Sequence, residues 1–286
     1  MEYPIRKLQT SEFPKALLEI ADPPKQLFVR GTLPSEDLTY LAIVGSRKHT
    51  PYGRDACDML IRGLAGYPVC IVSGLALGID SIAHKTALKY KLPTISFPGS
   101  GLDPSVLYPA SNRELAEDIV AYGGALISEF DPSFRAAQWT FPARNRLMAG
   151  IADAVLIIEA EEKSGTLITA RLALDYNKDV LAVPGSIFSE NSAGTNRLIR
   201  EGATPVRNSA DILEVLGFKT EEVIESKNLS LPESEQRVYN ALREPISRDD
   251  LAYELDMPIH LLNIELTKLE LKEIIREELG KIYRVR

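Results

Sequence analysis

Residues 41–78 read LAIVGSRKHTPYGRDACDMLIRGLAGYPVCIVSGLALG, and this stretch decides the fold. Two short apolar runs, Leu41–Val44 and Val69–Val72, enclose an amphipathic stretch over residues 53–65 that is typical of a helix. The apolar runs do not alternate with polar residues, which indicates strands that are buried on both faces of a sheet. Strand, helix and strand in this order predict two parallel strands joined by a right-handed crossover.

The same unit recurs along most of the chain. Further apolar runs lie at residues 94–97, 125–128, 154–158 and 180–183, and helical patterns lie near 79–90, 111–121, 144–151, 165–177 and 194–202. The repetition predicts an α/β fold, with a doubly wound, Rossmann-like parallel sheet over residues 39–217. Residues 1–38 contain five prolines and predict an N-terminal extension of loops with one short helix near 13–20.

A small second domain is expected at the C-terminus. Residues 218–232 are polar and charged, which predicts a linker. Three helical patterns follow, with Ser234 and Ser247 as expected N-caps, and then a hairpin around Leu279-Gly280; together they predict a winged-helix-like domain over residues 233–286. Residues 228–286 carry three Lys and six Arg against nine Glu and three Asp, so protein contact or dimerisation is favoured over DNA reading.

Composition limits the function classes. The 286 residues carry a net charge of −7, which argues against a general polyanion binder, so any nucleic-acid site must be basic locally. No apolar run is long enough to cross a bilayer and the N-terminus lacks a signal-like apolar stretch, so a cytoplasmic protein without a membrane partner is expected. Two cysteines and three histidines show no metal-ligand spacing, and neither a metal nor a cofactor is predicted.

Small and basic residues follow the predicted strands, at the edge where parallel sheets bind ligands. Backbone N–H groups at such turns and at helix N-termini attract anions. Before the strand at 154–158, two arginines lie beside aromatic residues, which suits a nucleic-acid backbone with a base stacked nearby. The predicted DNA-binding residues are Gly45, Ser46, Arg47, Ser73, Gly74, Gly99, Ser100, Phe141, Arg144, Asn145, Arg146, Lys163, Ser164, Gly165 and Thr166.

Three structural alternatives stay open for these residues. The glycines could serve only to make tight turns between strands and helices. Arg144 and Arg146 could pair with surface carboxylates, and Trp139 and Phe141 could belong to the core.

Enzyme motifs are incomplete, and no catalytic residue is predicted. Lys163–Thr166 resembles half of a P-loop, but the full Walker pattern is absent, so ATP hydrolysis is not expected. Asp80 and His84 lie four residues apart and could form a dyad, although a structural pair is the more common outcome. Glu159, Glu161 and Glu162 could include a hydrolytic carboxylate, although such a cluster is more often solvated.

The ordered set of motifs resembles the DprA/Smf family, the DNA-processing proteins of natural transformation. It consists of Val44–Arg47, Ser73–Asp80 with Ala83-His84, Phe141–Arg146 with Ala149-Gly150, Lys163–Ala170, and Val183–Gly185 with Gly194–Asn196 and Glu201–Ala203. The resemblance covers about residues 40–210 and the tail resembles the family's winged-helix-like domain. It implies a Rossmann-like domain that binds and protects single-stranded DNA in competence and recombination, helps to load the RecA recombinase, and forms a homodimer.

The resemblance also implies the roles of particular residues. Phosphates would be held by Gly45–Arg47 and Lys163–Thr166, with Arg144 and Arg146 as neighbours, and without nucleotide hydrolysis.

Two other functions share part of the pattern. Rossmann-like nucleotide phosphoribohydrolases have a similar sheet and a Pro-Gly-Gly-x-Gly-Thr loop followed by a Glu, whereas Lys163–Thr166 lacks both the Pro-Gly-Gly run and that Glu. A duplex-specific transcription regulator would use the winged helix, but the acidic third helix, Pro258–Lys272, argues against this.

Overall fold

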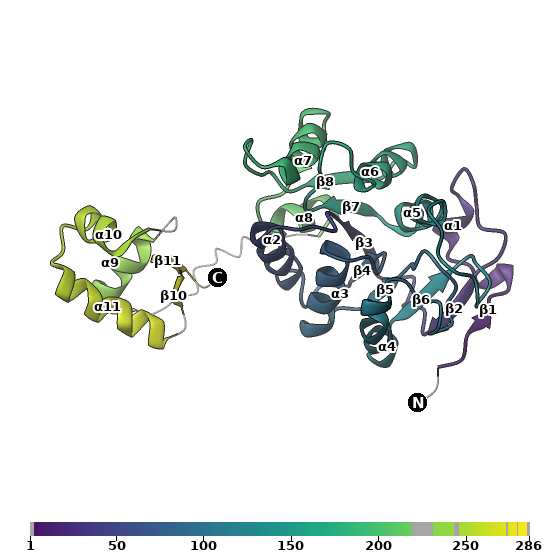
Figure 1. The fold of residues 1–286 in the computed structure, drawn as a ribbon, viewed down its shortest axis with the longest axis horizontal. Helices are drawn as coiled ribbons and strands as arrows, with labels where there is room; N and C mark the ends of the chain where they lie inside the picture. Colours follow the sequence, from purple (N-terminus) through teal and green to yellow (C-terminus); the bar gives the residue numbers. More distant parts are fainter. Residues whose placement is uncertain (1–2, 219–230, 243–245, 273, 279, 285–286) are drawn as a thin grey trace. The chain divides into compact units, whose positions relative to one another are not determined.

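The computed structural model describes residues 3–218, 231–242, 246–272, 274–278 and 280–284 (Figure 1). The chain divides into two compact units, Met1–Thr220 and Glu221–Arg286, which are described separately below. Apart from its ends, the predicted linker at 218–232 lies outside the described residues. Among the described residues, no helix combines the length and the apolar character that crossing a membrane would require.

The first unit is built on one sheet, which has nine strands within the described residues, in the order β1-β2-β6-β5-β4-β3-β7-β8-β9. The strands from β3 to β9 pair in parallel: β3 Thr39–Val44, β4 Val69–Ser73, β5 Thr94–Ser96, β6 Ala125–Ser128, β7 Ala154–Ile157, β8 Asp179–Ala182 and β9 Thr204–Pro205. All six predicted strands are present, and the doubly wound fold class is confirmed.

The strand order reverses beside β3. From β3 the chain builds outward through β4, β5 and β6, and it then returns to place β7, β8 and β9 on the other side of β3. Ligands of open parallel sheets bind at the carboxyl ends of the strands at such a reversal. The topology therefore predicts a ligand-binding site at the loops that follow β3 and β7.

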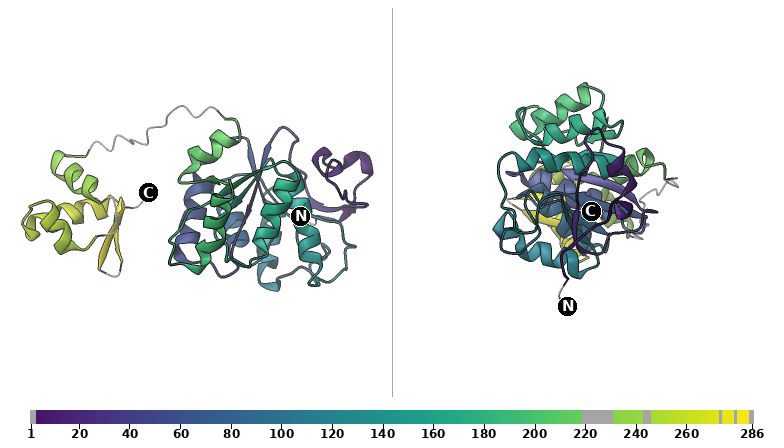
Figure 2. Two further views of the ribbon diagram at one scale, coloured as in Figure 1. Left: turned by 90° about the horizontal axis from the view of Figure 1, so that it is seen from above. Right: turned by 90° about the vertical axis from the view of Figure 1, so that its right-hand side faces the viewer.

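Helices cover both faces of the sheet (Figures 1 and 2). The helical elements are η1 Thr10–Glu12, α1 Lys15–Leu18, α2 Pro51–Arg62, α3 Ile79–Lys89, η2 Ala110–Asn112, α4 Arg113–Ala121, α5 Thr140–Ile151, α6 Thr166–Asp175, α7 Glu190–Arg200 and α8 Ser209–Val215. Successive strand side chains point to opposite faces. Accordingly Ala42 and Val44 pack with α1, α5 and α6, whereas Leu41 and Ile43 pack with α2, α3 and α8.

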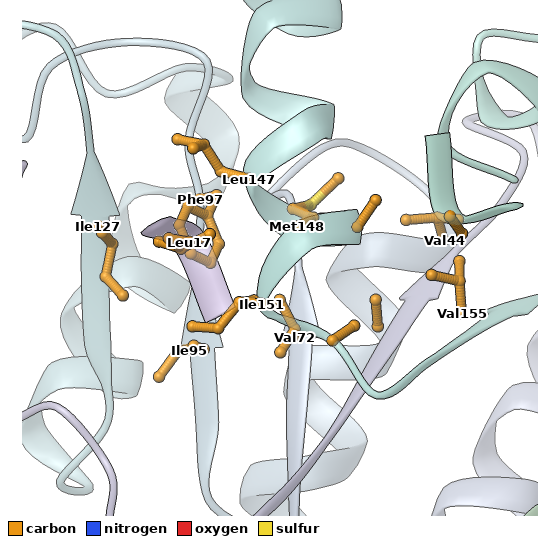
Figure 3. Close-up of a cluster of buried hydrophobic side chains, with 14 of the residues drawn as sticks. Leu17, Val44, Val72, Ile95, Phe97, Ile127, Leu147, Met148, Ile151 and Val155 are labelled. Atoms are coloured by element: carbon orange, nitrogen blue, oxygen red, sulfur yellow. The ribbon is translucent and has the colours of Figure 1, made fainter. Parts of the chain in front are cut away.

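The cluster beneath α5 shows how this helix is held. Figure 3 shows Leu147, Met148 and Ile151 of α5 among side chains from α1 and from the strands of the sheet. Both faces of β3 are buried, which is why its sequence lacks polar alternation. The packing places the first turn of α5 at the carboxyl edge of the sheet.

The short helix predicted near residues 13–20 is present as α1, but the prediction that loops make up the rest of the N-terminal segment is wrong. Strands β1 Arg6–Lys7 and β2 Phe28–Gly31 extend the sheet, and β2 pairs antiparallel with β6. The apolar run in β2 is short and ends at Arg30, which hides the strand signal. Arg30 is nevertheless buried, because its guanidinium forms a two-pronged ion pair with Glu117 of α4 at 2.6 and 2.7 Å.

The second unit contains α9 Glu233–Ala241, α10 Arg248–Glu254 and α11 Ile259–Leu271, followed by the antiparallel pair β10 Ile275–Glu278 and β11 Lys281–Arg284. This is the order of elements that the sequence predicts, although Leu279 of the hairpin lies outside the described residues. Ser247 Oγ accepts from the Asp250 N–H at 3.2 Å, so this N-cap is confirmed. The Ser234 cap is wrong, because α9 begins one residue earlier, after Pro232.

Candidate functional site

A cavity of about 540 Å³ lies at the carboxyl ends of β3 and β7, where the strand order reverses. Four segments line it: the loop after β3, the segment that contains Ala76 and Asp80 at the start of α3, the residues around the first turns of α5, and the loop and first turn of α6. Of the predicted DNA-binding residues, the cavity brings together Gly45, Ser46, Arg47, Phe141, Arg144, Asn145, Lys163, Ser164, Gly165 and Thr166.

The loop after β3 is shaped by close contact with the start of α3. A Cβ on Gly45 would come within 2.7 Å of Ile79, so glycine is needed for this approach. Ser46 Oγ accepts the Lys48 N–H at 3.1 Å and closes the turn. Arg47 then projects from the loop, and its guanidinium lies 5.2 Å from the centre of the Phe141 ring, in a cation–π arrangement.

The start of α6 forms the opposite wall. Thr166 Oγ1 donates to the Gly45 carbonyl at 3.2 Å and ties this wall to the loop after β3. Ser164 Oγ accepts the Thr166 N–H at 3.2 Å, and the Leu167 and Ile168 N–H groups donate to the Ser164 and Gly165 carbonyls at 3.1 Å. Nothing lies within 4 Å of a Cβ built on Gly165, so space is open in front of the first turn. The positive end of the helix dipole and the neighbouring Lys163 favour an anion at this position.

Arg144 provides a buried positive charge at the cavity wall. It is 4% exposed, and its Nη1 donates to the Phe97 carbonyl at 2.6 Å. Burial lowers the Arg144 pKa to about 10, so the guanidinium remains charged at neutral pH. A Cβ on Gly74 would lie 1.6 Å from Nη1, so this predicted residue makes room for Arg144, and it lines a smaller hollow of about 30 Å³ next to the cavity.

Several residues of the cavity were not predicted from the sequence. Lys48 adds a further cation, Glu161 adds an exposed carboxylate, and Gln138 and Thr169 add polar groups. Lys48 directly follows the predicted Arg47, so its position in the sequence could have identified it as a further cation of the site. The cations of the cavity are therefore Arg47, Lys48, Arg144 and Lys163.

Three other predicted residues lie outside the cavity. Ser73 is buried, with its Oγ donating to the Ile43 carbonyl at 2.6 Å, and Ser100 Oγ donates to the Gly101 carbonyl at 2.9 Å. Gly99 lies under the Phe141 ring, which a Cβ would approach to 2.6 Å. These residues lie at the predicted edge of the sheet. The two serine hydroxyls, however, donate to backbone carbonyls, and Gly99 is covered by Phe141.

Arg146 faces away from the cavity, so its predicted place there is wrong. Its Nη2 donates to Glu129 at 2.5 Å, and its Nε lies 3.2 Å from an Asp22 carboxylate oxygen. Residues two apart on a helix point about 200° apart, so Arg144 and Arg146 of α5 cannot face the same cavity. The pairing with carboxylates is the alternative that the structure supports.

Of the candidate catalytic residues, Asp80, His84 and Glu159 have structural partners, whereas Glu161 and Glu162 are exposed. Asp80 accepts from the Gly74 N–H at 3.1 Å, and burial raises its pKa although Arg144 acts in the opposite direction. His84 Nδ1 instead contacts Thr94 Oγ1 at 2.8 Å, and burial lowers the His84 pKa to about 3, which keeps the ring neutral. Glu159 is buried and accepts from the N–H and hydroxyl of Thr50 at the start of α2. Asp80 and His84 thus do not form a dyad.

The two cysteines and the groups that could bind a metal ion form no metal-binding cluster among the described residues. Cys57 and Cys70 are buried free thiols, and burial raises the pKa of both. Within the part of the chain that the structure describes, no group of three or more His, Cys, Asp or Glu side chains could hold a metal ion.

Comparisons with known proteins concern mainly the first unit. A family model described as DNA recombination-mediator protein A matches residues 5–217. The Smf protein of Escherichia coli K12 is 42% identical over 209 residues, which cover 73% of this chain but only 55% of that protein. The chain thus matches about half the length of this curated relative.

Two solved structures are also similar. DNA processing protein A from Streptococcus pneumoniae matches with 37% identity and a TM-score of 0.69, covering 74% of each chain. The Helicobacter pylori protein of the same name, whose structure is described for its single-stranded DNA binding mode, matches with 35% identity and a TM-score of 0.66. That match covers 75% of this chain and 96% of the other.

Proposed function

Because this chain belongs to the DNA recombination-mediator protein A family, we propose that it binds single-stranded DNA in the cavity at the carboxyl ends of β3 and β7. The observation that carries the proposal is the convergence of Arg47, Lys48, Arg144 and Lys163 with the N-terminus of α6 in one cavity of an acidic protein. The Helicobacter pylori relative, which is described for its single-stranded DNA binding mode, supports the choice of ligand.

The phosphates supply the binding energy in this proposal. One phosphate lies in the open space before Gly165, where it meets the first turn of α6 and Lys163. A neighbouring phosphate meets Arg47 and the N–H groups of the loop after β3. Contacts of this kind fix the strand without reading its sequence, so binding is largely sequence-neutral.

The shape of the cavity favours a single strand. Phe141 presents a half-buried ring at its wall, with Arg47 on one face, and a base that has left a duplex could stack there. A duplex keeps its bases stacked and paired, so it has no free base face to place on this ring.

We infer that the cavity retains DNA rather than cleaving it. Glu159 is buried against Thr50, and Asp80 is held by loop N–H groups, so neither is presented to a ligand as a free base. Glu161 is the exposed carboxylate of the cavity, and an assay for cleavage of oligo-dT, from which no cleavage is expected, tests its role. The competing phosphoribohydrolase function is tested by incubation with AMP, from which no adenine release is expected.

The cellular role that we propose is natural transformation in the cytoplasm. There the chain would protect incoming DNA and help to load the RecA recombinase, acting as a homodimer. Support for this role comes from membership of the family. The second unit, with its acidic balance, would serve partner contact rather than DNA binding.

A competition experiment tests the proposed function. Fluorescently labelled oligo-dT is bound to the full chain and displaced with unlabelled single strands or with duplex of equal phosphate content. Single strands are expected to compete at much lower concentration. Equal or better competition by the duplex would contradict the proposal.

The Arg146→Met variant separates stability from DNA binding. Removing one partner of the largely buried Arg146–Glu129 pair should lower the free energy of unfolding by about 3 kcal/mol. Affinity for oligo-dT should stay within about twofold of the wild-type value at temperatures where the variant is folded, because Arg146 faces away from the cavity. Chemical denaturation and fluorescence anisotropy measure the two quantities.

The matched control is Arg197→Met, which removes the exposed i,i+4 pair with Glu201. It should leave the free energy of unfolding almost unchanged, because an exposed ion pair in water contributes little to stability. If Arg146→Met instead weakened DNA binding without loss of stability, that result would assign Arg146 to the DNA-binding site.

A further inference from the structure

Three aromatic side chains form a cluster at the carboxyl edge of the sheet, outside the cavity. Phe130 and Phe134 are stacked with their ring centres 5.1 Å apart. The Trp139 ring stands nearly perpendicular to both, at 5.6 and 5.8 Å. The indole rests against these two rings, and Trp139 is 59% exposed.

The cluster is held by a well-anchored loop between β6 and α5. The Gly101 N–H donates to the Phe134 carbonyl at 2.8 Å, and Thr140 Oγ1 donates to the Gly99 carbonyl at 2.6 Å. A Cβ on Gly101 would lie within 2.3 Å of two carbonyl oxygens of this loop, so the backbones are closely packed. A ligand that binds to this surface loses little free energy to ordering of the loop.

Helix capping does not explain why a tryptophan stands at position 139. This residue is the N-cap of α5, a position that favours Ser, Thr, Asp or Asn, and its side chain makes no capping hydrogen bond. A small polar residue would stabilise the helix better and would leave no apolar surface in water. The indole thus serves neither the helix cap nor the buried core, and its surface is available to a ligand.

The cavity and the cluster are contiguous. Gln138 lines the cavity and directly precedes Trp139, while Phe141 and Asn145 line it from the following turns of α5. A strand that leaves the cavity away from α6 must pass the start of α5, a helix only about 10–12 Å wide. Arg135 is exposed in the same loop and could meet a phosphate there.

We propose that Trp139, supported by Phe130 and Phe134, is a stacking platform for one base of the strand that leaves the cavity. The inference rests on the proposed function and extends it by a base subsite. Every base has an apolar face, so the platform adds affinity without adding sequence preference. A nucleobase fits better than a protein side chain because the platform offers a single indole face beside a phosphate-binding cavity.

The test uses the fact that Trp139 is the only tryptophan of the chain. Titration of the full chain with oligo-dT should quench its fluorescence as binding saturates. Trp139→Ala should weaken oligo-dT binding by roughly 5- to 150-fold, the range for one base–aromatic stack, without changing the salt dependence. Trp139→Phe should recover much of the loss.

Two controls identify the interaction. Tyr122→Ala removes a 76%-exposed ring at the end of α4, near the opposite edge of the sheet, and should bind like the wild-type chain. An abasic oligonucleotide keeps every phosphate but has no base to stack. The wild-type chain and Trp139→Ala should therefore bind it equally well.

The results separate the platform from the cavity. If oligo-dT binds but the fluorescence of Trp139 is unchanged and Trp139→Ala binds normally, the platform is wrong and the cavity stands. If Trp139→Ala weakens abasic and oligo-dT binding equally, its role is structural, which overturns the stacking. If oligo-dT does not bind at all, the proposed function and the platform both fail.

Discussion

The Arg47→Ala/Lys163→Ala double variant is expected to bind oligo-dT at least about 100-fold more weakly than the wild-type chain. Each side chain would make a charge-assisted hydrogen bond to phosphate, worth about 1.5–3 kcal/mol. The slope of log affinity against log salt should also become shallower by about 0.7 for each phosphate that the variant no longer neutralises. Fluorescence anisotropy over a salt series measures both effects.

This variant should fold normally. Arg47 and Lys163 are exposed, and neither forms a salt bridge with another described residue. Their removal should change the free energy of unfolding by no more than about 0.5 kcal/mol. A loss of affinity would therefore report on the site rather than on the fold.

The matched control is Lys85→Ala/Arg200→Ala, which removes one Lys and one Arg from exposed positions on α3 and at the end of α7. Its net charge changes by the same amount, so it measures the effect of overall charge alone. Equal weakening by both double variants would mean that the cavity is not the site. Wild-type affinity in the Arg47→Ala/Lys163→Ala variant would mean the same.

The second large effect is expected from Gly78→Ala. Gly78 has φ +81°, and a Cβ there would lie 2.3 Å from the Ser46 carbonyl oxygen and 2.7 Å from the Arg47 Cα. Both atoms are backbone and cannot swing aside. The free energy of unfolding should fall by about 3 kcal/mol or more, through left-handed strain and displacement of the phosphate loop.

Gly123→Ala is the control for the backbone conformation alone. Gly123 also has a left-handed φ, +88°, but nothing lies within 4 Å of its Cβ position. It should cost only about 1–2 kcal/mol in chemical denaturation, without loss of DNA binding. Equal losses of stability in the two variants would show that contact between Gly78 and the Ser46–Arg47 loop is unimportant.

The parts of the fold that could be predicted are those with a repeating local signal. Buried parallel strands leave unbroken apolar runs, as in Leu41–Val44 and Val69–Val72, and the crossover rule then orders them. The same logic placed Gly45–Arg47 and Lys163–Thr166 at one edge, and the structure brings these two segments into one cavity.

Other parts depend on contacts that are distant in sequence. Strand β2 is short and contains Arg30, whose burial depends on Glu117. The rotation of α5, which turns Arg144 inward and Arg146 outward, is set by packing on the sheet and by the partners of Arg146. Ser73 and Ser100 end strands at the predicted edge, but which way a hydroxyl turns cannot be inferred from its place in the chain.

Hydrogen exchange of the backbone amides, with and without saturating oligo-dT, tests the central claim most directly. The backbone amides of residues 45–48 and 163–169 are expected to gain protection in the full chain, because the bound strand covers these two segments and opposes their local opening. Residues 233–284 of the second unit are expected to exchange unchanged. Bound oligo-dT that protected only the second unit, and left both cavity loops unprotected, would contradict the account.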